Sequence, residues 1–223
     1  MNKDLTAVYF PTEFPRVSII NTLLTIESAI EQGKVKKESR TGGLPNLWSV
    51  KIDGVKHIFI KHPEKEIPII YFTLKSIIAT DIGKVVRISG IAKHTELIRG
   101  ELDKYHGYQD LPSRIILDLL VPEFSIVSCD RLQTEDGKRL WDNLVKEMFI
   151  ERSNYHLYLW DFRDVDKIVL RRLKTYKAFK NLESMIYGNS SEHKNILLVI
   201  SNKELKQTNI SKTVKAFRIE NKG

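Results

Sequence analysis

The sequence has a single cysteine, Cys129, among its 223 residues. An internal disulfide and a zinc site with paired cysteines are therefore both excluded. The six histidines form no HxxxH or HExxH pair with one another, so the sequence predicts no metal site. No run of about 18 apolar residues occurs, which argues against a membrane-spanning helix. The first ten residues carry Asp4 and lack the apolar core of a signal peptide. We therefore expect a cytoplasmic protein.

Glycine and proline are also scarce, with 11 and 7 residues, which argues against a low-complexity chain. Hydrophobic residues make up 42% and charged residues 29% of the sequence, as in globular proteins generally. The length is sufficient for one large domain with a small appendage.

Positive charge is concentrated in the last third of the chain. From Glu151 onward there are fifteen lysines and arginines against eight acidic residues, which accounts for +7 of the net charge of +8. Such a region attracts the phosphates of nucleic acid, of a nucleotide cofactor, or the carboxylates of an acidic protein. A solvated lysine-rich surface would produce the same composition.

The hydrophobic pattern alternates between helical and strand periods along the chain. We expect helices at 17–36, 111–120, 134–150 and 174–187, with Pro122 ending the second of them. We expect strands at 47–52, 55–61, 67–78, 84–93, 124–129, 154–160 and 195–201. The first four strands follow one another through short turns, including Asp53-Gly54, and should form an antiparallel meander.

This order predicts an α+β fold with a mixed, mostly antiparallel sheet flanked by helices, and with an N-terminal helix. We divide the chain into a helical segment and linker at 1–45, an α/β domain at 46–202 and a basic tail at 203–223. Trp141 lies on the apolar face of the helix at 134–150 and is expected in the core.

One segment, at 112–149, has a recognisable order of elements. A helix leads into a short strand that ends in Ser128-Cys129-Asp130, and a polar loop containing Gln133 and Thr134 opens the next helix, which carries Gly137 and Trp141. This order resembles the second half of the N-acetyltransferase fold known as GNAT, in a divergent form of the phage or mobile-element type. The resemblance covers roughly residues 47–201.

The resemblance implies an acyltransferase that moves an acyl group from acetyl-CoA to an amine, which would belong to a host component if the protein is encoded by a phage. It further implies a slot between the strands at 84–93 and 124–129, beside residues 95–113, that admits the pantetheine arm. The implied catalytic residues are Asp130, His106 and Ser128, and the implied cofactor-binding residues are Arg99, Gly100, Gly107, Ser113, Gln133 and Thr134. From the residues alone, Asp130 fits a general base or a loop cap, and His106 fits a site loop or an ordinary surface loop.

The basic residues Arg171, Arg172, Lys174, Lys177 and Lys180 are expected on one amphipathic helix, where they could follow a phosphate backbone. They could equally form its solvated face. The alternative function is therefore a non-catalytic GNAT-fold module that recognises nucleic acid or an acidic host protein through its last third. A structural or accessory protein of a virus is a third alternative.

Overall fold

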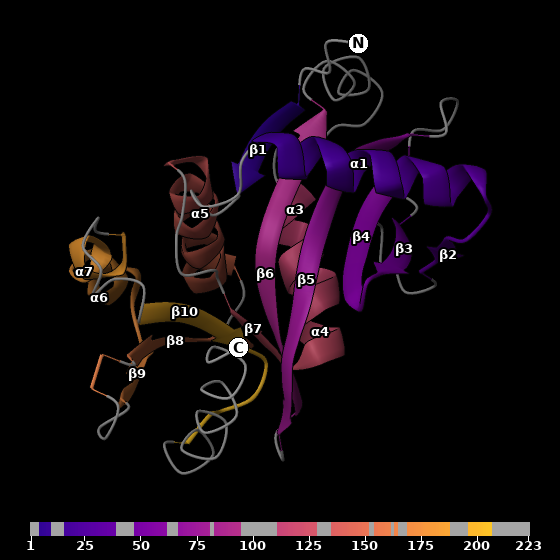
Figure 1. Ribbon diagram of the computed structural model, residues 1–223. Coiled ribbons are helices and arrows are strands. Elements are labelled where there is room, and N and C mark those ends of the chain that lie inside the picture. The colour runs from indigo at the N-terminus through magenta and orange to yellow at the C-terminus, as the bar shows by residue number, and fades with distance from the viewer. Residues whose placement is uncertain are drawn as a thin grey trace.

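The computed structural model describes residues 5–9, 16–38, 47–61, 67–80, 83–94, 111–128, 135–151, 154–161, 163–164, 169–187 and 196–206. These residues form an α+β fold whose ten described strands make one mixed, mostly antiparallel sheet. The predicted fold class is confirmed at this level. Figure 1 shows helix α1 (Arg16–Glu31) on one face of the central strands and helices α3 (Leu111–Arg114) and α4 (Val121–Phe124) on the other.

The sheet is continuous from β2 to β9. Its order is β2 (Lys36–Lys37), β3 (Leu47–Ile52), β4 (Val55–Lys61), β5 (Pro68–Thr80), β6 (Gly83–His94), β7 (Ile126–Ser128), β10 (Ile196–Ser201), β8 (His156–Asp161) and β9 (Val169–Leu173). The remaining described strand, β1 (Leu5–Tyr9), pairs with β6 outside this path. Among the described pairs, β6 and β7 run parallel and all others run antiparallel.

The predicted meander is confirmed as β3 to β6, with β5 and β6 slightly longer than expected. The turn between β3 and β4 consists of Asp53 and Gly54, whose φ angles are 49° and 80°. Positive φ at both turn residues matches the right-handed twist of a two-residue hairpin, which is why Asp-Gly is favoured there. This turn sets the β3–β4 register, in which Ile52 lies opposite Val55.

Helix α1 (Arg16–Glu31) lies across β4, β5 and β6 (Figure 1). Its buried residues Leu23 and Ile26 share a core cluster with Phe59 and Tyr71 of the sheet. The helix ends earlier than the predicted residue 36, because Gly33 adopts a φ of 66° and the chain then enters β2. Residues 16–31 therefore pack on the same sheet as the meander.

A second helical run joins β6 to β7 in the chain. It consists of α3 (Leu111–Arg114), the π-helical turn η2 (Ile115–Leu120) and α4 (Val121–Phe124). The prediction that Pro122 ends this helix is wrong. In η2 the N–H of Val121 donates to the carbonyl of Ile116, five residues back, and the next donor in this series would be residue 122, which has no N–H. The carbonyl of Leu117 instead accepts the hydroxyl of Tyr155 at 2.8 Å, so the helix passes through the proline.

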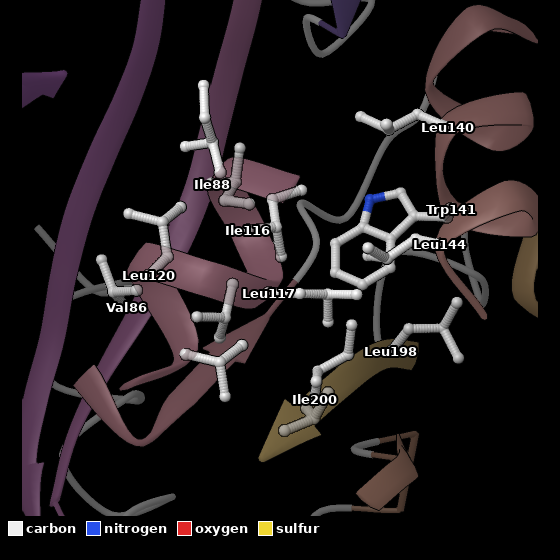
Figure 2. Close-up of a cluster of buried hydrophobic side chains, with 14 of the residues drawn as sticks. Val86, Ile88, Ile116, Leu117, Leu120, Leu140, Trp141, Leu144, Leu198 and Ile200 are labelled. Carbon is white, nitrogen blue, oxygen red and sulfur yellow. The ribbon is translucent and has the colours of Figure 1, made fainter. Parts of the chain in front are cut away.

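The main core lies between this helical run, α5 (Glu135–Glu151) and the central strands. Figure 2 shows Trp141 and Leu144 of α5 facing Ile116 and Leu117 of η2, above Leu198 of β10. Trp141 is 1% exposed, which confirms its predicted place in the core.

The last part of the chain differs most from the prediction. Strand β9 was not expected, and it pairs with β8 as an outer strand of the sheet. The single helix expected at 174–187 is wrong: two short helices, α6 (Tyr176–Lys180) and α7 (Glu183–Tyr187), take its place. The N–H of Asn181 still bonds to the carbonyl of Lys177, but the chain turns at residues 181–182 before α7 begins.

Candidate functional site

Strand β6 pairs with one strand along its first edge and with two different strands along its second edge. Its first edge pairs with β5 throughout. On the second edge, Val85, Val86 and Arg87 pair with β7, and Ile91 to His94 pair with β1. Within the described strands, residues 88–90 have no partner on this second edge, and we call them the open edge.

A β-bulge lies at the open edge. Thr73 of β5 pairs with Gly90, and the next residue, Leu74, pairs with Ile88, so Ser89 is inserted between them. The Ser89 hydroxyl donates to the Thr73 carbonyl at 3.2 Å and so ties the bulge to β5. A bulge bends its strand and redirects the backbone groups beside it, which is a frequent arrangement next to active sites.

Polar side chains extend from this bulge across two further strands. The Thr73 hydroxyl lies 3.2 Å from Nδ1 of His57, the register partner of Thr73 on β4. Since side chains alternate along a strand, His57 shares the face of Phe59, which is the face packed against α1. We call His57, Thr73 and Ser89 the polar row.

The histidine of the polar row is neutral near pH 7. His57 is 5% exposed, and burial lowers its pKa to about 4. A neutral imidazole can donate one hydrogen bond and accept one. The Thr73 hydroxyl can accept from a protonated Nδ1 or donate to an unprotonated one. The row therefore holds an uncharged polar network within the sheet. No pattern in the sequence indicates this row, because a bulge depends on the pairing of two strands.

Of the three predicted catalytic residues, the structure describes the backbone of Ser128 alone. Ser128 ends β7 and pairs with Arg87, directly before the open edge. Asp130 and His106 lie outside the described residues.

The predicted cofactor-binding residues are described at one position. Ser113 is part of α3 and is 5% exposed, as a core residue would be, so its burial does not favour contact with a solvated phosphate. Arg99, Gly100, Gly107, Gln133 and Thr134 lie outside the described residues.

The five predicted nucleic-acid-binding residues do not lie on one helix, which corrects that prediction. Arg171 and Arg172 belong to β9, Lys174 follows it, and Lys177 and Lys180 belong to α6. The strand forms because Val169–Leu173 pairs with β8, and the helix starts only after Thr175, whose hydroxyl accepts the N–H of Ala178.

Two of these five cations bind acidic residues of the chain. Arg172 donates to Glu204 at 2.7 Å and to Nδ1 of His156 at 2.9 Å. Lys180 lies 2.6 Å from Glu183 and 3.1 Å from Asp142. The other three, Arg171, Lys174 and Lys177, are exposed and meet no acidic side chain from the described part of the chain. We call these three residues the basic end.

Comparison with protein-family models, with curated proteins and with solved structures gives no match. Among the described residues, no three side chains of His, Cys, Asp or Glu are grouped as metal ligands would be. In the same part of the chain, no helix is both long and apolar enough to cross a membrane.

Proposed function

We propose that the chain is a GNAT-like acyltransferase that moves an acyl group from coenzyme A to an amine at the open edge of β6. The observation that carries this proposal is the β6–β7 pair. Two parallel strands, joined in the chain through a helical run, pair at three positions, and the last of these pairs lies two residues before a bulge in β6.

The chemistry of the donor suits a strand edge. The pantetheine arm is an extended chain with two amide groups, so it can pair with backbone N–H and C=O groups as an added strand does. Backbone N–H groups beside the bulge would hold the acyl carbonyl and stabilise the negative charge that forms on its oxygen during attack.

The reaction requires no covalent enzyme intermediate. The amine nitrogen attacks the thioester carbon and forms the new C–N bond, the C–S bond breaks, and coenzyme A leaves as a thiol with the proton that the amine loses. Asp130, two residues beyond the end of β7, and His106 are the proposed bases for this proton. Holding the two reactants in line supplies most of the acceleration.

The proposal is tested by titrating the protein with acetyl-CoA in a calorimeter and by following thiol release with a set of amines. A ligand present at 100 times its dissociation constant should stabilise the fold by about 2.7 kcal/mol. Asp130→Asn should reduce kcat with unchanged acetyl-CoA binding, whereas Asp53→Asn, in the β3–β4 turn, should change neither. Absence of binding at millimolar acetyl-CoA would refute the proposal.

A second function, a nucleic-acid-binding module, is favoured by the basic end. Replacing Arg171, Lys174 and Lys177 with alanine should weaken binding to duplex DNA and reduce the slope of log K against log salt by about 0.9 for each phosphate that the variant no longer neutralises. The matched control replaces three exposed lysines at the opposite end of the sheet, Lys36, Lys37 and Lys51, and should leave the slope unchanged. Equal slopes for the two variants would exclude the basic end as the DNA site.

A further inference from the structure

The N-terminal strand lies on the edge that the proposed donor would need. Strand β1 runs antiparallel to the last part of β6, with Leu5 opposite His94, Thr6 opposite Lys93 and Ala7 opposite Ala92. It also lies against α5, on the side of β6 where β7 has ended (Figure 1). An extended arm that reaches the open edge along β6 would have to take the place of this strand.

Two features favour a strand that can leave. First, the pairing consists of four residue pairs and is interrupted after Ala7, because Tyr9 pairs with Ile91 and residue 8 is left over. Second, β1 is a separate strand of five residues off the main path of the sheet. Short, interrupted strands open at a small fraction of the free energy of global unfolding.

The edge itself needs an occupant. Ile91 of β6, which pairs with Tyr9 of β1, is fully buried, and backbone groups in such surroundings cost free energy when they have no hydrogen-bond partner. A peptide strand and a pantetheine arm both supply amide N–H and C=O groups, so either can meet this need. One of them can therefore replace the other without leaving the edge bare.

We propose that β1 is an exchangeable occupant of the β6 edge, which closes the acyl-donor site until coenzyme A displaces it. This inference rests on the proposed function and adds its regulation. The apparent affinity for the donor is then reduced by the fraction of molecules in which β1 has left the edge. An open state populated at about 1–10% would reduce that affinity about 10- to 100-fold.

The test uses full-length variants that release β1. In an antiparallel pair, successive residues point their N–H groups to opposite sides, so one of Thr6 and Ala7 donates to β6. The double variant Thr6→Pro/Ala7→Pro removes that donor whichever residue carries it. Its matched control, Thr6→Val/Ala7→Val, keeps both donors and favours a strand. We expect acetyl-CoA to bind the proline variant at least tenfold more tightly than the wild type or the valine variant.

A second variant locks β1 in place without disturbing the fold. Thr6→Cys/Lys93→Cys, in a Cys129→Ala background, joins two register partners whose Cα separation suits a disulfide. The oxidised protein should lose acetyl-CoA binding and recover it on reduction.

The outcomes separate the inference from the function on which it rests. Equal, measurable acetyl-CoA affinity in the wild type, the proline variant and the oxidised locked variant would overturn the inference and leave the acyltransferase proposal standing. No binding to any of them, the proline variant included, would overturn both.

Discussion

The hydroxyl of Tyr155 offers a sharp test of how the helix between β6 and β7 is held. In Tyr155→Phe the aromatic ring keeps its packing, and the carbonyl of Leu117 loses the hydrogen bond of 2.8 Å that it accepts. Leu117 is fully buried, and the residue that would otherwise donate to it in the π-helical series is Pro122. The N–H of Val121, four residues after Leu117, is already bonded to the carbonyl of Ile116, so the carbonyl of Leu117 relies on the Tyr155 hydroxyl.

The size of the effect follows from this arrangement. A buried acceptor left without its partner costs about 1–3 kcal/mol, more than the net value of an ordinary exposed hydrogen bond. We expect a loss of this size in the free energy of unfolding, measured by urea denaturation with an unchanged slope. Tyr176→Phe is the matched control. Its hydroxyl donates at 3.0 Å to Asp142, which keeps its ion pair with Lys180, so the loss should stay below about 1 kcal/mol.

A rescue variant separates the hydrogen bond from other effects of the substitution. Pro122→Ala restores an N–H at the position from which η2 would donate to Leu117. In the Tyr155→Phe background this change should recover about 1 kcal/mol relative to its effect in the wild type, as a double-mutant cycle would measure. A Tyr155→Phe variant as stable as the wild type, or a cycle without coupling, would refute this account of the helix.

Three further predictions concern the sheet and the core. Burial lowers the pKa of His57 from 6.5 to about 4. The free energy of unfolding is therefore highest above pH 6.5 and falls by about 3 kcal/mol as the pH drops toward 4, because the unfolded chain binds the proton more readily than the fold does. His57→Leu should flatten this part of the profile of unfolding free energy against pH. Trp141→Ala should cost roughly 3–5 kcal/mol in urea denaturation, whereas Ile150→Ala, at a side chain that is 68% exposed, should stay within about 0.5 kcal/mol. Gly54→Ala should cost about 1–2 kcal/mol by thermal denaturation because φ is 80° there, and an unchanged melting temperature would contradict the assigned turn.

The meander could be predicted from the sequence because its signals are local. Alternating side chains define β3 and β4, and the Asp-Gly turn fixes their register. Strand β10 was equally clear, since all six of its residues are buried and apolar or small. In each case, the pattern of apolar and polar residues within the segment matches the burial of those residues in the sheet.

The remaining differences arise where distant segments decide the structure. The segment of β9, Val169–Leu173, contains Arg171 and Arg172 and is mostly exposed. Although it pairs with β8, its sequence lacks the alternation of apolar and polar residues that would predict a strand. The second helix continues past Pro122 with the help of the Tyr155 hydroxyl, which comes from a distant part of the chain and cannot be predicted from the sequence of the helix itself. The place of Ser89 in a bulge depends on which residues of β5 lie opposite.

The bulge of β6 lies just beyond the point where the described pairing with β7 ends. The last β6–β7 pair joins Arg87 to Ser128, and the inserted residue, Ser89, follows two positions later. Because a bulge adds local twist and bends its own strand, we expect β6 to change direction just beyond that pair. The hydrogen bond from Ser89 to Thr73 holds the bend in place, and His57 supports Thr73 in turn. The polar row thus shapes β6 at the open edge, so residues that touch no ligand help to set the path of the strand beside which the proposed acyl donor would lie.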